Sequence, residues 1–402
     1  MSSSTVPEQA HGPATASRPN SFFSSPPSLE SFAAICSQTT HPHQFPLASS
    51  IERNVPIYDL PQWQTVDPDQ RLAFQAEWYQ VLLHGPGVFV TKRLYADHRV
   101  VDEATATFYD IIQREKDAGA SHGDHFAGAG KNDRIWNSFG KHCVADPASF
   151  LAYYSNPWLA LISASWLGPG YRITAQANNV KPGAAAQVSH RDYHLGFMSR
   201  ERCMQYPEAM QIASQLLTLQ GAVAHVDVPE ESGPTRLLPF SQTFEQGYLA
   251  YQLPEFDAYF LNNYVSLPLE KGDGIFFNPA LFHAAGTNQS THINRMVNLL
   301  QISSAFGKPM ESLDTLRLVR CCWDNLTALY RDKGLGDEVK AFVESLGDGY
   351  PFPTNLDIHE PKAGSMAPQS EQDIIWDALQ AGATKDSVIR NLEKYIAGRQ
   401  AF

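Results

Sequence analysis

The stretch YRITAQANNVKPGAAAQVSHRD, residues 171–192, decides the fold expected for this chain of 402 residues. Its first half is a strand-like run, a turn follows at 181–183, and a second extended piece ends in His190-Arg191-Asp192. More short runs of β-forming residues follow, each bounded by Gly, Pro or Asn, at 217–229, 235–241, 263–279 and 295–303. Because only one helical pattern interrupts these runs, at about 200–215, they predict an all-β barrel or jelly roll, not a parallel sheet.

Helical patterns flank this β-rich centre. The chain has a strand-like run at 54–60, amphipathic helical patterns near 68–87, 97–116 and 148–168, and helical patterns again after residue 306. The expected fold class is therefore mainly β with flanking helices, with a double-stranded β-helix (jelly roll or cupin-like) core, a helical N-terminal support and a helical C-terminal extension. The expected division is a flexible, Ser- and Pro-rich segment over 1–50, the β-helix domain with its N-terminal helices over 51–306, and the extension over 307–402.

Composition limits the partners and the compartment. Acidic residues outnumber basic ones by 42 to 30, for a formal charge of −12, so nucleic acid and anionic membranes are poor partners. Five cysteines without framework spacing predict reduced, buried thiols. No apolar run reaches membrane-spanning length, and the N-terminus has no secretory-signal pattern. We expect a cytoplasmic protein that binds a small molecule, with the C-terminal helices as a lid or a homodimer contact.

The triplet His190-Arg191-Asp192 predicts part of a metal site. Residues i and i+2 of a strand point to the same side, so His190 and Asp192 can reach one ion. A third ligand must come from a distant strand, and His283 ends a strand that follows the turn at 271–274. Two histidines and one carboxylate on one face are the ligands of non-haem Fe(II) oxygenases. Arg295, twelve residues after His283, supplies the guanidinium that would pair with a dicarboxylate cosubstrate.

Several other residues compete with this interpretation. A second triplet, His225-Val226-Asp227, precedes a turn and is interpreted as an ordinary strand histidine with a turn-flanking acid. His122 and His125 lie in a glycine-rich stretch, where a solvated loop is the simpler explanation. His194 fits a cavity or a loop equally well, and His292 fits a turn surface. Core packing is the default for the aromatic residues, but we expect at least one to line the substrate pocket: Trp136, Tyr193, Phe197 and Phe277.

Four motifs together resemble the phytanoyl-CoA dioxygenase-like (PhyH) family of Fe(II)/2-oxoglutarate oxygenases. They are Q-x-x-H-x-D at 187–192, SGPTRLLPFSQ at 232–242, GDGIFFNPALFHAAGTN at 272–288, and Arg295. The resemblance covers roughly residues 75–305. Family members usually end the second motif in His, where this chain has Gln242; that His is not an iron ligand, so the departure costs little.

The resemblance implies site residues and chemistry. His190, Asp192 and His283 would bind Fe(II), and Arg295 would pair with the C5 carboxylate of 2-oxoglutarate. Gln187 and Thr235 match positions that contact this cosubstrate, and Arg134 is a further candidate from a looser match. The implied reaction uses O₂, releases succinate and CO₂, and oxidises an aliphatic carbon of a small molecule. Family halogenases have Gly or Ala in place of Asp192, so its carboxylate favours hydroxylation, or desaturation, epoxidation or ring formation.

Two other functions stay open at the level of sequence. A cupin-type isomerase or dioxygenase that needs no 2-oxoglutarate would keep the iron triad without requiring Arg295. A non-catalytic barrel could keep the motif and serve as a binding module. No part of the sequence names the substrate.

Overall fold

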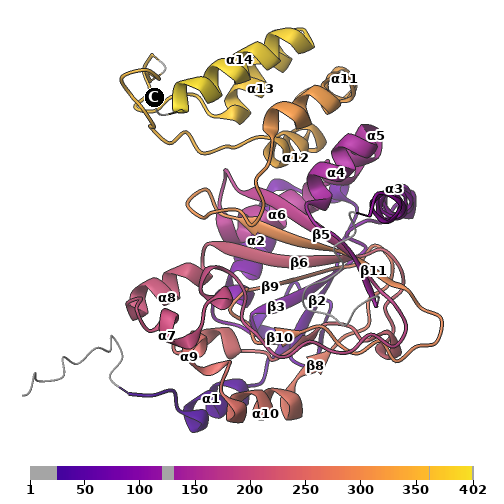
Figure 1. Cartoon of the computed structure of the whole chain (residues 1–402), viewed down its shortest axis with the longest axis vertical. Helices are drawn as coiled ribbons and strands as arrows, with labels where there is room; N and C mark the ends of the chain where they lie inside the picture. The colour runs from indigo at the N-terminus through magenta and orange to yellow at the C-terminus, as the bar shows by residue number, and fades with distance from the viewer. Residues whose placement is uncertain (1–24, 120–130, 362, 401–402) are drawn as a thin grey trace, which may run out of the picture.

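Two β-sheets form the centre of the protein. The computed structural model describes residues 25–119, 131–361 and 363–400 (Figure 1). The larger sheet has eight strands in the order β1-β2-β3-β9-β6-β11-β5-β4, and the smaller has three in the order β10-β7-β8. The strands of the larger sheet are β1 (Ser50–Glu52), β2 (Val55–Asp59), β3 (Val88–Lys92), β4 (Asn132–Ile135), β5 (Arg172–Val180), β6 (Thr218–Ala224), β9 (Gly274–Phe277) and β11 (Arg295–Ser303). Those of the smaller sheet are β7 (Arg236–Leu237), β8 (Val265–Ser266) and β10 (His283–Ala284).

Strand β11 is the central element of the larger sheet. It pairs antiparallel with β5 over its whole length and with β6 from Val297 to Ser303. Side chains alternate between the faces of a strand. On β11, Arg295, Val297, Leu299 and Gln301 line a cavity, while Met296 and the other even-numbered apolar residues are buried against the helices. The register of this one strand therefore separates the cavity from the hydrophobic core.

The helices cover the outer face and both ends of the sheets. In Figure 1, α2 and α6 lie behind the larger sheet, α11–α14 lie above it, and α1 and α10 lie below. Those before the strand β5 are α1 (Leu29–Cys36), α2 (Pro68–Leu83), α3 (His98–Asp117), α4 (Ser138–Ala145), α5 (Pro147–Tyr154) and α6 (Pro157–Leu167). The others are α7 (Arg200–Cys203), α8 (Glu208–Gln215), α9 (Gly247–Ala250), α10 (Pro254–Asn263), α11 (Thr315–Lys333), α12 (Asp337–Leu346), α13 (Glu371–Gln380) and α14 (Lys385–Arg399). None of these described helices combines the length and the apolar character needed to cross a membrane.

The structure corrects three expectations. The prediction of a mainly β chain is wrong, because the described residues form fourteen α-helices beside strands that are mostly short. The expected flexible segment over 1–50 does not fit its second half, where α1 packs Phe32 fully into an aromatic cluster; residues 1–24 lie outside the described part. The single helix expected near 200–215 is two helices, α7 and α8, because Pro207 precedes the second one.

One hydrophobic core connects the N-terminal helices to the C-terminal ones. Its buried residues come from α2 to α6, from β5 and β11, and from α11 to α14. At the contact between α5 and α12, the rings of Phe150 and Phe342 meet edge to face with centroids 5.7 Å apart. The core thus crosses the boundary at residues 306 and 307, and the proposed domain division there stays a prediction.

Replacing Phe342 with Ala should test this shared core. Phe342 is fully buried, so its removal should lower the free energy of unfolding by about 3–5 kcal/mol, as measured by urea denaturation. The control is Phe352→Ala, because Phe352 is 51% exposed and its loss should change stability by about 0.5 kcal/mol or less. Equal effects of the two substitutions would contradict a core that includes α12.

Candidate metal centre

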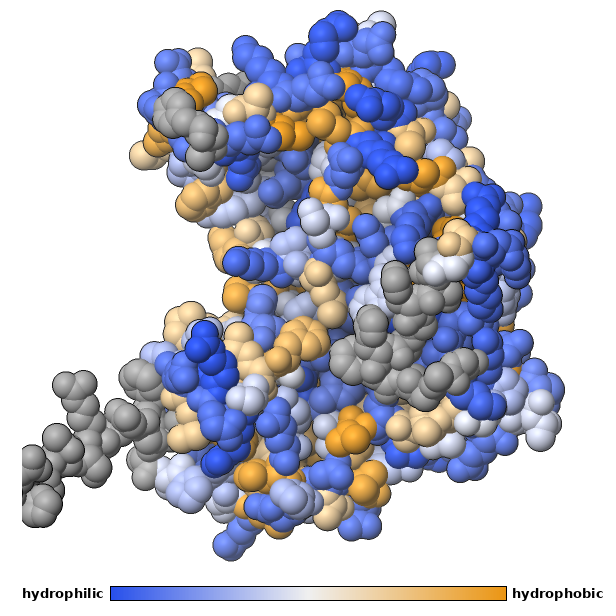
Figure 2. All heavy atoms as spheres, in the orientation of Figure 1, coloured by the Kyte–Doolittle hydropathy of each residue, from blue (hydrophilic) through white to orange (hydrophobic). Residues whose placement is uncertain are grey.

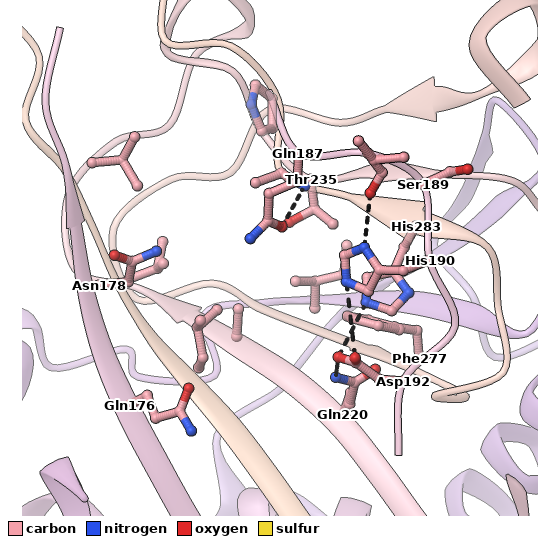
Figure 3. A pocket seen from close by; sticks show the side chains of 18 of the residues that line it. Gln176, Asn178, Gln187, Ser189, His190, Asp192, Gln220, Thr235, Phe277 and His283 are labelled. Atoms are coloured by element: carbon pink, nitrogen blue, oxygen red, sulfur yellow. Dashed lines mark hydrogen bonds and ion pairs between the residues drawn. The ribbon is translucent and has the colours of Figure 1, made fainter. Parts of the chain in front are cut away.

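His190 and His283 face each other across an isolated antiparallel bridge. The backbone N–H of His190 donates to the carbonyl of His283 at 3.0 Å, and the N–H of His283 donates back at 3.1 Å. Directly opposed residues in such a pair project to the same face, and the two imidazole centroids lie 4.3 Å apart. Asp192 follows two residues later, held by a hydrogen bond from its N–H to the carbonyl of Pro279 at 2.8 Å. Figure 3 shows the three side chains converging.

The donor atoms of this triad are arranged to share one ion. Nε2 of His190 lies 3.9 Å from Oδ1 of Asp192, and Nε2 of His283 lies 3.5 Å from Oδ2. One ligand atom from each residue lies within 4.8 Å of the others. The Nδ1 atoms contact the carbonyls of Val188 and Leu281 at 2.9 and 2.8 Å. Because a carbonyl can only accept, each Nδ1 carries the proton and each Nε2 keeps a lone pair for a metal.

Asp192 is held as a carboxylate. Burial raises the pKa of its side chain, but His190, His283 and Gln220 outweigh this effect and hold the pKa well below its usual range. The Nε2 of Gln220, on β6, donates to Oδ2 of Asp192 at 2.5 Å. Burial lowers the pKa of His190, and the adjacent His283 adds to this shift, which favours the neutral imidazole. Two neutral imidazoles and one carboxylate fit the donor set of a facial Fe(II) site with open positions.

Arg191, between the two ligands, points to the opposite side and fixes the local chain. Its fully buried guanidinium donates from Nη2 to the carbonyls of Ser241 and Phe244 at 2.5 and 2.9 Å. A Cβ at Gly247 would lie 1.8 Å from Cζ of Arg191, so only glycine fits there. The alternation of the H-x-D triplet therefore places two candidate ligands in the cavity and an anchor behind them.

All seven residues predicted for the site line one cavity of about 770 Å³. The triad lies on one wall, and Gln187 and Thr235 lie close together in Figure 3, on the side of the cavity above Asn178. The Oε1 of Gln187 accepts a hydrogen bond from the N–H of Ala285 at 3.2 Å. Arg134 reaches the cavity from β4, where it pairs in register with Asn178.

Arg295 is a buried cation in the cavity wall. Its side chain is only 5% exposed, and Nη1 donates to the carbonyls of Ser232 and Gly286 at 3.1 and 3.4 Å. Burial lowers the pKa of its guanidinium to about 10, so it stays charged at neutral pH. Within the described part of the chain, no carboxylate lies at ion-pair distance from Arg295, which leaves it suited to an anionic ligand.

The competing residues lie elsewhere. His225 is buried against the helices, with Nδ1 2.8 Å from the hydroxyl of Thr105 and Nε2 3.0 Å from that of Tyr153. Burial lowers its pKa to about 3, as expected of a neutral core histidine. Asp227 accepts from the N–H of Lys271, as a turn-flanking acid would. His122 and His125 fall outside the described residues. His194 is not among the cavity residues, whereas Phe197 and Phe277 are, as expected of at least one aromatic residue.

Two residues of the site were not predicted from the sequence. Gln220 orients Asp192, and Met310 reaches the cavity from the loop after β11. Strand alternation through 218–224 could have placed Gln220 on the same face as Ala222, but its contact with Asp192 depends on the pairing of β6 with β9, since Asp192 is bonded to Pro279 just after β9. Nothing in the local sequence distinguishes Met310.

The fold and the triad fit a class of protein that holds a metal with two histidines and one carboxylate in a cavity between β-sheets. The profile of the Phytanoyl-CoA dioxygenase (PhyH) family matches residues 83–297, more than half of the chain. The chain belongs to this family. The family is one of iron(II)- and 2-oxoglutarate-dependent dioxygenases, and the triad and the cavity fit that class.

Individual relatives are more distant. Dioxygenase trt7 of Aspergillus terreus is 28% identical over 165 residues, which are 41% of this chain and 47% of the relative. Dioxygenase andF of Emericella variicolor is 25% identical over 145 residues, 35% of this chain and 45% of the relative. The chain thus matches about half the length of these curated relatives.

Solved structures are similar at a lower level. The non-heme alpha ketoglutarate dependent carbocyclase SnoK from nogalamycin biosynthesis has a TM-score of 0.43 and 16% identity, covering 62% of this chain and 94% of SnoK. HygX from Streptomyces hygroscopicus, with nickel and 2-oxoglutarate bound, has a TM-score of 0.38 and 12% identity, covering 62% of this chain and 92% of HygX. These values are too low to transfer a ligand or an activity to this chain.

Replacing Asp192 with Ala should abolish metal binding in a buffer without halide ions, which could otherwise fill the vacated position. The two imidazoles would then have no charged oxygen to complete the set. Isothermal titration with Mn(II), an air-stable substitute for Fe(II), measures the affinity. Asp257→Ala is the matched control, because Asp257 also lines the cavity but lies outside the triad. Loss of binding in the control, or its retention in Asp192→Ala, would contradict the assignment.

Replacing Gln220 with Leu should weaken metal binding without abolishing it. The carboxylate of Asp192 would lose the donor that fixes its orientation, and such losses reduce metal affinity by about 10- to 100-fold. Gln301→Leu is the control, because Gln301 is the cross-strand neighbour of Gln220 and no hydrogen bond joins it to Asp192 among the described residues. An unchanged affinity in Gln220→Leu would show that Asp192 needs no such support.

Proposed function

We propose that this protein is an iron(II)- and 2-oxoglutarate-dependent dioxygenase that hydroxylates an aliphatic carbon of a small molecule, in secondary metabolism. The observation that carries the proposal is the convergence of His190, Asp192 and His283 on the wall of a cavity that also contains the buried cation Arg295. Membership of the family supports the reaction class. Since the match to the curated relatives covers only about half of their length, the activity of the whole protein is part of the proposal.

Each residue has a proposed role. His190, Asp192 and His283 hold the iron, and Arg295 pairs with the far carboxylate of 2-oxoglutarate. Gln187, Thr235 and Arg134 complete the cosubstrate end of the cavity. When bound, Fe(II) and 2-oxoglutarate supply the oxidising chemistry, in which O₂ is consumed, succinate and CO₂ are released, and one oxygen atom enters a substrate C–H bond.

The remaining work of the chain is positioning and exclusion of water. Nδ1–H donation to backbone carbonyls fixes both imidazole planes, and Gln220 fixes the carboxylate. The apolar lining, with Leu267, Ile275 and Val297 among its members, limits solvent near the reacting carbon. The retained carboxylate of Asp192 leaves no space for a halide ligand, which supports hydroxylation over halogenation.

The finer description of the fold belongs to the same proposal. The larger sheet and the smaller sheet, with the segment of His190 added to the smaller one by the bridge to His283, are proposed to be the two halves of a double-stranded β-helix of the jelly-roll type. We also propose a cytoplasmic location, no nucleic-acid or membrane partner, and a homodimer through α11–α14. The net charge of −12 supports the exclusion of polyanionic partners.

Anaerobic titration with Fe(II) and 2-oxoglutarate tests the function. The wild-type protein should develop a weak visible charge-transfer band, and His190→Ala or Asp192→Ala should abolish it. Arg295→Ala should bind Fe(II) normally but need about 10- to 100-fold more 2-oxoglutarate for half of the band, as expected from losing charge-assisted hydrogen bonds of about 1.5–3 kcal/mol.

The other outcomes identify the competing functions. Fe(II) binding without a band would indicate an iron enzyme that does not use 2-oxoglutarate. Absence of metal binding would indicate a binding module. An unchanged 2-oxoglutarate requirement in Arg295→Ala would show that the cosubstrate is anchored elsewhere. Substrate-dependent release of succinate across a set of metabolites would then identify what is oxidised.

A further inference from the structure

The cavity has two chemically different ends along β11. Arg295 and Gln301 both face it and are six residues apart, which is about 20 Å along a strand. The metal triad lies on the Gln301 side of the cavity, because Asp192 accepts a hydrogen bond from Gln220, and Gln220 is paired in register with Gln301. A 2-oxoglutarate held by Arg295 and the triad would fill the part of the cavity between them, on the Arg295 side of the metal. The end at Gln301 is therefore left for another molecule.

Carboxamides line this second end. Gln301 on β11 is 7% exposed and Gln176 on β5 is 2% exposed, and both line the cavity. The Oε1 atom of Gln301 is buried and accepts no hydrogen bond from the described residues. A buried acceptor without a partner is costly, and such atoms in native proteins are usually satisfied by water or a ligand. We therefore expect a molecule bound at this end of the cavity to donate a hydrogen bond to Oε1 of Gln301.

The surroundings of Gln301 are largely apolar and contain no cation, and the charged group beside them is the buried carboxylate of Glu311, which is hydrogen-bonded to the side chain of Gln176. The charged residues that line the described cavity are Asp192 in the triad, Arg134 and Arg295 at the other end, and Asp257, whose carboxylate accepts from Ser189 at 2.7 Å. Among the described residues that line the cavity, no lysine or arginine lies on a strand position next to Gln301. A carboxylate, phosphate or thioester-linked nucleotide would find no partner there.

Apolar groups cover the same end. Phe277 is paired in register with Gln220 and packs on His283 with ring centroids 4.8 Å apart. Above Gln176, the Sδ atom of Met310 accepts from its Nε2 at 3.4 Å and from the hydroxyl of Tyr193 at 3.2 Å. The loop that carries Met310 thereby closes the cavity over the two carboxamides. At about 770 Å³, the whole cavity has room for a molecule of several rings besides the cosubstrate.

From these contacts we infer that the substrate is a neutral molecule with a largely apolar skeleton, and that one of its hydroxyl groups donates a hydrogen bond to Oε1 of Gln301. This inference rests on the proposed function and adds a substrate class to it. Gln301 is then a specificity-determining residue. Its bond, one strand away from Gln220 and Asp192, orients the skeleton so that a C–H bond near the hydroxyl faces the triad. Gln176 narrows the same end by holding Met310.

The test compares three related compounds on the anaerobic protein loaded with Fe(II) and 2-oxoglutarate. The probes are decahydro-2-naphthol, its methyl ether, which cannot donate a hydrogen bond, and decahydronaphthalene-2-carboxylate, which is charged. Binding is measured by saturation-transfer NMR and by the change in the charge-transfer band. The alcohol should bind about five-fold more tightly than the ether, the size expected of one neutral hydrogen bond, and the carboxylate should bind more weakly than both.

Gln301→Leu should remove the preference for the alcohol and leave the ether affinity within about two-fold, because only the acceptor is lost. Gln113→Leu, the same change on the exposed face of α3, should leave both affinities unchanged. The inference is overturned if none of the probes binds, if the alcohol and ether bind equally, if the carboxylate binds as tightly as the alcohol, or if the preference survives in Gln301→Leu.

Different results would contradict the proposed function and the role of Gln301. If the wild-type protein forms no charge-transfer band with Fe(II) and 2-oxoglutarate, the proposed function is wrong. If the band forms in the wild type and in Gln301→Leu, but the alcohol has no advantage over the ether in either, the function stands and only the role of Gln301 is wrong. Thermal unfolding of both variants checks that each one is folded.

Discussion

The pair of backbone hydrogen bonds between His190 and His283 is the constraint on which the site depends. The two residues are 93 positions apart in sequence, and the two bonds bring them directly opposite each other with their side chains on one face. Asp192 then reaches the same point because it lies two residues beyond His190. A register shift of one residue would turn Arg191 into the cavity and both ligands of the triplet out of it. Metal affinity is therefore a direct readout of strand register.

The anchors behind the triad explain why that register is stable. Arg191 holds the chain at 241–247 through two carbonyls, and Gly247 leaves the space that its guanidinium fills. The long antiparallel pairing of β11 with β5 and β6 supports the wall of the cavity that β11 forms. The candidate ligands thus lie on a rigid frame, and Arg295, which would bind a keto diacid, and Gln301, which would bind a neutral substrate, lie toward opposite ends of β11.

The local sequence pattern was enough to select the candidate metal ligands. The other residues of the site could be identified only from the pairing of the strands in the structure. The alternation in 188–192, the turn before His283 and the place of Arg295 predicted residues that the structure brings to one cavity. Gln220 and Gln301 could not be identified in advance, because their roles follow from the register of β6 against β9 and β11 and not from their neighbours in sequence. The mainly β prediction failed for a related reason, since the strands are short and long helices such as α3 and α11 surround them.

The core that connects α11–α14 to the N-terminal helices has a practical meaning for handling the protein. Residues 351–361 and 363–369 contain neither helix nor strand, and Met366 is 94% exposed. Such exposed backbone without secondary structure is a preferred site of proteolytic cleavage. Because Ile375, Leu379 and Leu392 are packed into the main core, the severed terminal fragment would stay bound. Such a nicked preparation would run as two bands on a denaturing gel and elute as one particle from a sizing column.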